Sequence, residues 1–135
     1  MPWVIKWDDR MISLGNEFIP QGVPFFVISS NDVVNYPQDG PDPMRARALQ
    51  KGYPFPYLYD ESQNVAREYG ALVTPHVFLF DGAGKPRYRG ALDDNPDLEA
   101  RPTTTYLKDA IEAIIRHSET TPASTKPVGC SVKWK

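Results

Sequence analysis

The sequence holds few side chains that could do redox or acid–base chemistry: one cysteine, Cys130, and two histidines, His76 and His117. A cysteine thiolate is a nucleophile, and a histidine can carry a proton near neutral pH. One cysteine forms neither an internal disulfide nor a thiolate zinc site, and the two histidines lack metal-motif spacing. Redox chemistry would therefore centre on Cys130, unless this residue only anchors the C-terminal tail by packing. We predict neither a metal nor a cofactor.

A second candidate site surrounds Pro75, which follows Thr74 and precedes an apolar run that begins at His76. A proline in this position can adopt the cis form and hold a tight turn, or it can be a trans proline that ends a loop. His76 could face such a site or could be an ordinary strand histidine. Near the N-terminus, Pro2 suits the first position of a helix, and Trp3 could border a substrate surface or belong to the core.

The elements that would position these residues follow from the hydrophobic pattern. The predicted helices lie at 3–18, 44–51, 61–69 and 103–117. The predicted strands lie at 23–29, 53–59, 74–80 and 87–91. The first and third strands are almost continuous apolar runs, which is typical of strands buried on both faces, and the last two form a β-hairpin. The order predicts an α/β fold with a parallel core and an attached antiparallel hairpin.

Capping residues define the expected helix ends. Gly22, Gly52 and Gly70 each follow a predicted helix, where a glycine commonly ends the last turn. Asp60 is expected to cap the helix at 61–69, and Gln63 follows it at the spacing of a capping box.

Length and charge limit the classes of protein that remain. The chain has 135 residues and a formal net charge of −2, so no basic surface predicts nucleic-acid binding. No apolar run approaches the ~18 residues of a membrane span, and the N-terminus does not have the pattern of a signal peptide. We expect a cytoplasmic protein with one domain at 1–117. Residues 118–135 then form a Ser/Thr/Pro-rich linker and an apolar tail that docks on the domain or on a partner.

Several stretches, in the same order along the chain, resemble a bacterial thioredoxin-like, peroxiredoxin-like family of the redoxin or AhpC/TSA type. The matching stretches are 7–11, 52–61, 73–75, 77–81, 93–96 and 127–134. The resemblance implies a thioredoxin-like α/β fold, a three-layer sandwich with a mixed sheet. It also implies that the loop with a cis-Pro75 faces the start of the first helix, so Thr74, Pro75, His76, Pro2 and Trp3 become the expected substrate-binding or partner-binding residues.

The resemblance also implies features that this sequence does not carry. In this family a Cys-x-x-Cys pair stands just before Pro2, preceded by a strand that becomes the central strand of the sheet. The resemblance therefore predicts a chain truncated before or within that motif, or a natural short form, with a sheet that lacks its first, central strand. Two strand edges would then be unpaired, which favours self-association as a homodimer.

The family implies thiol–disulfide redox activity of the antioxidant type, with protein disulfides or peroxides as substrates. A disulfide-exchange cycle needs an attacking and a resolving thiol, and Cys130 alone cannot supply both. We therefore expect an inactive or impaired redox protein, with Cys130 as its candidate catalytic residue. The alternative is a redox-inactive module that binds a peptide or protein partner beside Pro75.

Overall fold

The computed structural model describes residues 2–95, 104–120 and 122–135, without the side chains of residues 2–6. It consists of two compact units, and each is described by itself. The first unit contains Met1–Trp7 and Leu72–Ser131, and the second contains Asp8–Ala71 and Val132–Lys135. The domain boundary expected after residue 117 stays a prediction.

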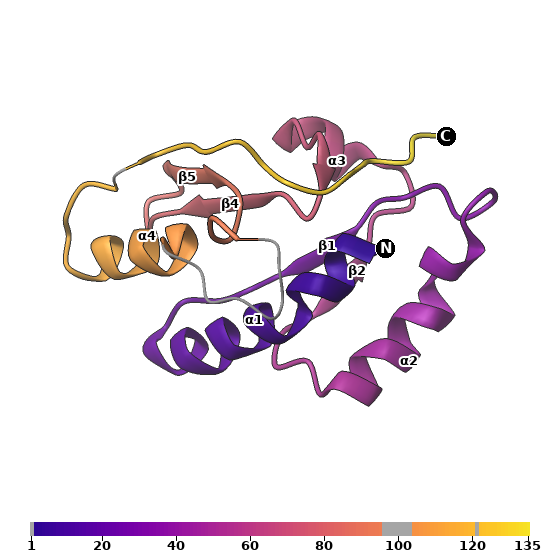
Figure 1. Ribbon diagram of the computed structural model, residues 1–135, viewed down its shortest axis with the longest axis horizontal. Helices are drawn as coiled ribbons and strands as arrows, with labels where there is room; N and C mark the ends of the chain where they lie inside the picture. Colours follow the sequence, from indigo (N-terminus) through magenta and orange to yellow (C-terminus); the bar gives the residue numbers. More distant parts are fainter. Residues whose placement is uncertain (1, 96–103, 121) are drawn as a thin grey trace. The chain divides into compact units, whose positions relative to one another are not determined.

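The first unit is built around the β-hairpin of β4 (Val77–Phe80) and β5 (Pro86–Gly90), which confirms the predicted hairpin (Figure 1). The Asp81 carboxylate closes its turn by accepting the N–H groups of Ala83 and Lys85, both at 3.0 Å. The helix α4 (Tyr106–Ile115) buries Leu107, Ala110, Ile111 and Ala113. It begins three residues later than predicted, and position 103 lies outside the described residues.

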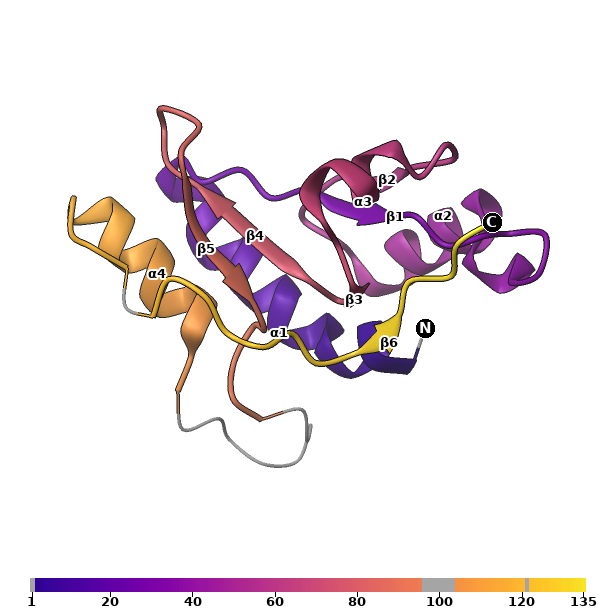
Figure 2. The ribbon, with the colours of Figure 1, turned by 90° about the horizontal axis from the view of Figure 1, so that it is seen from above.

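A tail segment of the first unit runs beside β5 and then beside a short strand that precedes the hairpin (Figure 2). Residues 123–125 lie beside β5, where Arg89 N–H donates to the Ala123 carbonyl and Thr125 N–H donates to the Arg89 carbonyl. Further on, β6 (Cys130–Ser131) pairs antiparallel with β3 (Val73–Thr74). Because unpaired strand edges invite pairing with other chains, these contacts protect the unit against aggregation.

Tyr88 joins the hairpin to this tail. Its hydroxyl donates to the Ala91 carbonyl at 2.5 Å and lies 2.6 Å from the Thr125 hydroxyl. Burial raises the pKa of Tyr88 from its ordinary value of 10.0 to about 12. The folded state therefore holds the phenolic proton more tightly than the unfolded state does, so the associated stability is complete below pH 10 and is lost as the pH rises towards 12.

We expect Tyr88→Phe to flatten this alkaline loss of stability. The wild-type free energy of unfolding should fall between pH 9 and pH 11.5, by up to about 2 kcal/mol more than that of the variant. Near neutral pH the variant should be less stable by about 1 kcal/mol, because it loses the hydroxyl's hydrogen bonds. Urea unfolding at a series of pH values measures both effects, and parallel pH profiles would contradict the prediction.

The second unit contains most of α1 (Pro2–Phe18), the short 3₁₀ turns η1 (Ile19–Gln21) and η2 (Pro37–Asp39), and α2 (Pro41–Lys51). It also contains β1 (Val27–Ser29), β2 (Tyr57–Tyr59) and α3 (Asn64–Tyr69). The strands β1 and β2 pair in parallel (Figure 1). Gly22, Gly52 and Gly70 all have positive φ, of 89°, 66° and 71°. Gly52 and Gly70 end α2 and α3 as predicted, whereas Gly22 ends the turn η1 that follows α1.

The two apolar strands are shorter and less buried than predicted. β1 covers only the last three residues of the expected 23–29, and none of the residues of β1 or β4 is fully buried. Phe26 is 62% exposed and Phe80 is 38% exposed. Within the described residues β1 pairs only with β2 and β4 only with β5, and a strand with one neighbour leaves its other edge open. The expectation of strands covered on both faces is therefore wrong. Whether a second chain covers these edges stays a prediction.

The helix predicted at 61–69 begins at Asn64 instead. Asp60 still caps it, since its carboxylate accepts the N–H groups of Val65 and Ala66 at 3.4 and 3.1 Å. The capping box is wrong, because the Gln63 amide donates to the Ser30 carbonyl at 2.8 Å and not back to Asp60. Gln63 itself has φ of 65°, a left-handed conformation that starts the helix three residues late.

Candidate functional site

The predicted site residues around Pro75 come together in the first unit. The Thr74–Pro75 peptide bond is cis, and it directly follows the strand β3. Val73 faces Ser131 and Thr74 faces Cys130 across the antiparallel β3–β6 pair. Because directly opposed residues of such a pair project to the same face, the Thr74 hydroxyl and the Cys130 thiol share one side of the ladder. The chain's single cysteine thus lies beside the proline loop.

Gly129 allows β6 to approach so closely. A Cβ atom placed on Gly129 would lie 2.2 Å from the carbonyl oxygen of Thr74 and 3.1 Å from the nitrogen of Pro75. No other residue type could keep the backbone at this distance from the loop. The glycine before Cys130 is therefore a positioning element of the site.

The two side chains at the centre of the site differ in their environments. The Thr74 hydroxyl oxygen is buried without a hydrogen-bond partner among the described residues, and buried polar atoms of this kind are uncommon. Cys130 is a free thiol with intermediate exposure. The site therefore combines a reagent-accessible sulfur with an unused hydroxyl on the same face.

His76 is held as a neutral ring. Its Nδ1 accepts the N–H of Leu72 at 3.2 Å, and its ring stacks on Phe78 with centroids 4.4 Å apart. Burial, together with the nearby charge of Arg89, lowers the pKa of His76 below its ordinary value. A neutral ring with Nδ1 as the acceptor carries its proton on Nε2. The contacts with Leu72 and Phe78 fix the ring in place, so His76 helps to shape the loop.

The remaining predicted residues, Pro2 and Trp3, belong to the first turn of α1. The helix begins at Pro2, as the sequence predicted, and Figure 2 shows this turn beside β6. Residues 2–7 are part of the same compact unit as the Pro75 loop. The side chains of Pro2 and Trp3 lie outside the described residues, so their roles stay predictions.

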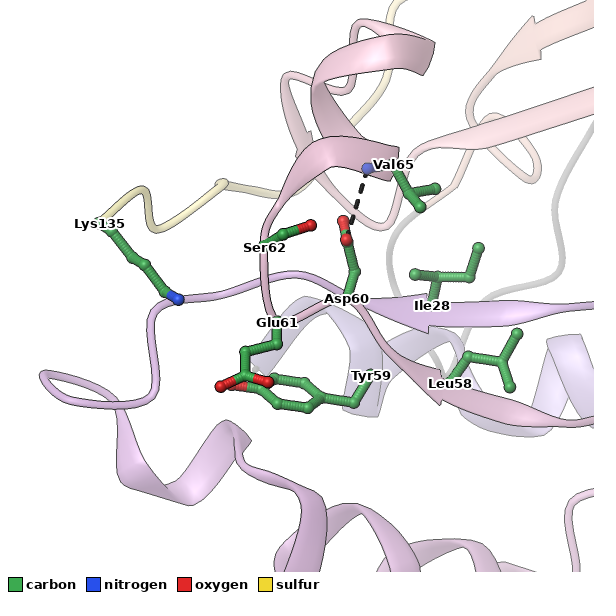
Figure 3. Close-up of a pocket in the computed structure, with 8 residues that line it drawn as sticks. All are labelled: Ile28, Leu58, Tyr59, Asp60, Glu61, Ser62, Val65 and Lys135. Carbon is green, nitrogen blue, oxygen red and sulfur yellow. Dashed lines mark hydrogen bonds between the residues drawn. The ribbon is translucent and has the colours of Figure 1, made fainter.

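A separate hollow of about 690 Å³ lies in the second unit, at the ends of β1 and β2 (Figure 3). Its walls are Ile28, Leu58, Tyr59, Asp60, Glu61, Ser62, Val65 and Lys135. The Asp60 carboxylate is committed to the N-terminus of α3 and to the Ser30 hydroxyl, at 2.8 Å. Among the described residues no group of three or more His, Cys, Asp or Glu side chains could hold a metal ion.

The mixed sheet elements, the cis-proline loop and the order of helices and strands define a thioredoxin-like α/β fold. A family model described as AhpC/TSA matches residues 7–89, more than half of the chain. The chain belongs to the AhpC/TSA family.

Two solved structures share this fold closely. An uncharacterized conserved protein from Geobacillus kaustophilus is 40% identical, with a TM-score of 0.93 over 99% of this chain and 71% of that chain. A hypothetical protein from Sinorhizobium meliloti 1021 is 31% identical, with a TM-score of 0.92 over 99% of this chain and 74% of that chain. No curated protein matches the sequence. In the part of the chain that the structure describes, no helix is long and apolar enough to cross a membrane.

Proposed function

We propose that the chain is a thiol–disulfide redox protein of antioxidant type with impaired turnover, in which Cys130 is the redox thiol. The observation that carries this proposal is the position of Cys130, opposite Thr74 and beside cis-Pro75, in a member of the AhpC/TSA family. Its substrates would be protein disulfides or peroxides.

One thiol can carry out only the first step of a disulfide-exchange cycle. The Cys130 thiolate attacks one sulfur of a partner disulfide, the partner's S–S bond breaks, and the other partner sulfur leaves as a thiolate. The resulting mixed disulfide must be resolved by a second thiol, which an external dithiol supplies. With a peroxide, the thiolate takes one oxygen to become a sulfenic acid, the other oxygen leaves in water or an alcohol, and the dithiol again returns the thiol. The need for an external resolving thiol is why we expect slow turnover.

An insulin-reduction assay with excess dithiothreitol tests Cys130 directly. The wild-type chain should raise the rate by a small factor, about twofold to tenfold, over dithiothreitol alone, and Cys130→Ser should remove that increment completely. Ser131→Ala, the neighbouring residue of β6, whose side chain is exposed, serves as the matched control and should retain it. The same three proteins can be compared with a peroxide substrate. An increment that survives in Cys130→Ser would exclude Cys130 as the redox thiol.

A second function is favoured by a different observation. The β3 edge beside Pro75 already accepts an extended segment, β6, through antiparallel pairing. An edge that takes one strand can take a partner's strand by the same backbone hydrogen bonds. A redox-inactive module that binds extended peptides is therefore the alternative, and it predicts no wild-type increment in either assay.

A further inference from the structure

In the second unit, a set of side chains and backbone groups surrounds the four residues that follow β6. The backbone of Val132–Lys135 lies in a cradle that we define as Asn31, Asp32, Tyr36, Gln63 and Arg67. Asn31, Asp32 and Tyr36 come from the segment after β1, Gln63 directly precedes α3, and Arg67 lies in the last turn of α3. Neither the family match nor the related structures assign a role to this site.

The cradle forms hydrogen bonds with the backbone of the segment, as one strand does with its neighbour in a sheet. Lys133 N–H donates to the Asn31 side-chain oxygen at 2.9 Å. The Lys133 carbonyl accepts from Asp32 N–H at 2.7 Å and from the Gln63 amide at 2.9 Å. Two residues on, Lys135 N–H donates to the Gln63 side-chain oxygen at 3.1 Å. Contacts at alternate residues are what an extended chain offers to one side.

The groups that make these contacts are buried and held in place. Gln63 is fully buried and Asn31 is 3% exposed. The amide of Gln63 is also fixed by the Ser30 carbonyl, and that of Asn31 by the Asp39 carboxylate at 3.1 Å. Buried amides without a partner are costly, so the cradle favours an occupant that supplies backbone N–H and C=O groups.

The side chains of the segment indicate which sequence the cradle prefers. Val132 is 6% exposed and supplies the apolar contact. The Lys133 ammonium lies 5.7 Å from the centroid of the Tyr36 ring, and the Arg67 guanidinium lies 5.2 Å from the centroid of the Trp134 ring. Such cation–π contacts favour a basic and then an aromatic residue.

We propose that this cradle is a peptide-recognition site for extended protein segments with an aliphatic–basic–aromatic pattern. The chain's own residues 132–135 fill it in the structure and act as a reversible, competing occupant. The partner is another protein that presents such a segment, and it binds when the chain's own tail is released. This proposal does not depend on redox activity at Cys130.

Full-length Val132→Asp provides the test, because a charge at this buried position should expel the tail while leaving every cradle residue in place. The probe is a fluorescein-labelled synthetic peptide with the sequence of residues 132–135, followed by fluorescence anisotropy. In the wild type the tethered tail competes at an effective concentration in the millimolar range. The peptide should therefore bind Val132→Asp at least tenfold more tightly than it binds the wild type. Unfolding of the variant could not produce such a gain.

Leu49→Asp is the matched control, since it introduces the same charge at a residue of α2 that is 85% exposed. It should bind the peptide as weakly as the wild type does. Two altered peptides test the mode of binding without changing the protein. N-methylation at the Lys133 position removes the N–H group that Asn31 accepts, and replacing the Trp134 position with alanine removes the Arg67 contact. The first should weaken binding at least tenfold and the second about threefold.

Three results would overturn the proposal. The first is peptide binding by Val132→Asp that is no tighter than binding by Leu49→Asp, and the second is equal binding of the N-methylated and the unmodified peptide. The third is a heterodimer between wild type and Val132→Asp in sedimentation experiments at the same protein concentrations, because it would assign the vacated cradle to the tail of a second copy. Tighter peptide binding with no heterodimer supports recognition of another protein.

Discussion

Arg47→Met should lower the free energy of unfolding by about 3–5 kcal/mol, because it leaves the carboxylate of Asp8 buried without its counter-charge. Asp8 is fully buried in the second unit, and the Arg47 guanidinium forms an ion pair with it. The hydroxyl of Tyr53 donates to the same carboxylate at 2.6 Å and accepts from Arg47 at 3.0 Å. When Arg47 is removed, Asp8 still bears the desolvation cost of its burial, but the attraction that offsets this cost is lost.

Arg45→Met is the matched control on the same helix, α2. Arg45 pairs with Asp42 three residues away, but both side chains are largely exposed, at 74% and 90%. An exposed pair of this kind contributes at most about 0.5 kcal/mol. Guanidinium unfolding curves of both variants measure the difference. Adding Asp8→Asn to Arg47→Met should recover part of the loss, since it removes the buried charge. Equal losses in the two arginine variants would refute the structural role of the network.

Gly129→Ala is expected to have the second-largest effect, a loss of about 2–3 kcal/mol. The added methyl group would stand 2.2 Å from the Thr74 carbonyl oxygen, and a backbone atom cannot move away as a flexible side chain can. Relief requires β6 to separate from β3, so the Cys130 thiol should also become more accessible. We expect its alkylation by iodoacetamide to be several-fold faster than in the wild type.

Gly82→Ala is the control for this substitution. A Cβ atom at Gly82, in the turn of the β4–β5 hairpin, would meet no atom within 4 Å. Its free energy of unfolding should stay within about 0.5 kcal/mol of the wild type, and the Cys130 alkylation rate should not change. If Gly129→Ala behaves like Gly82→Ala in both measurements, then β6 does not pack on β3 as the structure describes.

The features that the sequence predicted correctly depend on neighbouring residues. Gly52 and Gly70 end helices because a local positive φ suits glycine, and the predicted hairpin turns through contacts among Asp81, Ala83 and Lys85. The features that it missed depend on distant ones. The length of β1 and its exposure follow from which strands pair with it, and no pattern within 23–29 contains that information.

The same distinction applies to the candidate site. Thr74, Pro75 and Cys130 were each recognisable as candidates from residue type and local context. Their meeting depends on the β3–β6 pairing, which joins Thr74 to Cys130 and Val73 to Ser131 across a long stretch of chain. The partners of Asp8 and Gln63 were not predicted for the same reason. Gln63 was predicted to belong to a capping box. Its side-chain amide instead forms hydrogen bonds with the backbone of Ser30, Lys133 and Lys135.

The contacts of residues 123–131 with β5 and β3 also set an order of events during synthesis. The ribosome makes β3, β4 and β5 well before the residues that cover their edges, so the hairpin emerges with β5 open on one side. Thr125, which bonds the Arg89 carbonyl, and Cys130 arrive only after α4 has been made. The nascent chain therefore passes through an interval in which exposed strand edges can pair with other chains. Chaperone binding and slow translation should matter most for this protein between the completion of β5 and the emergence of β6.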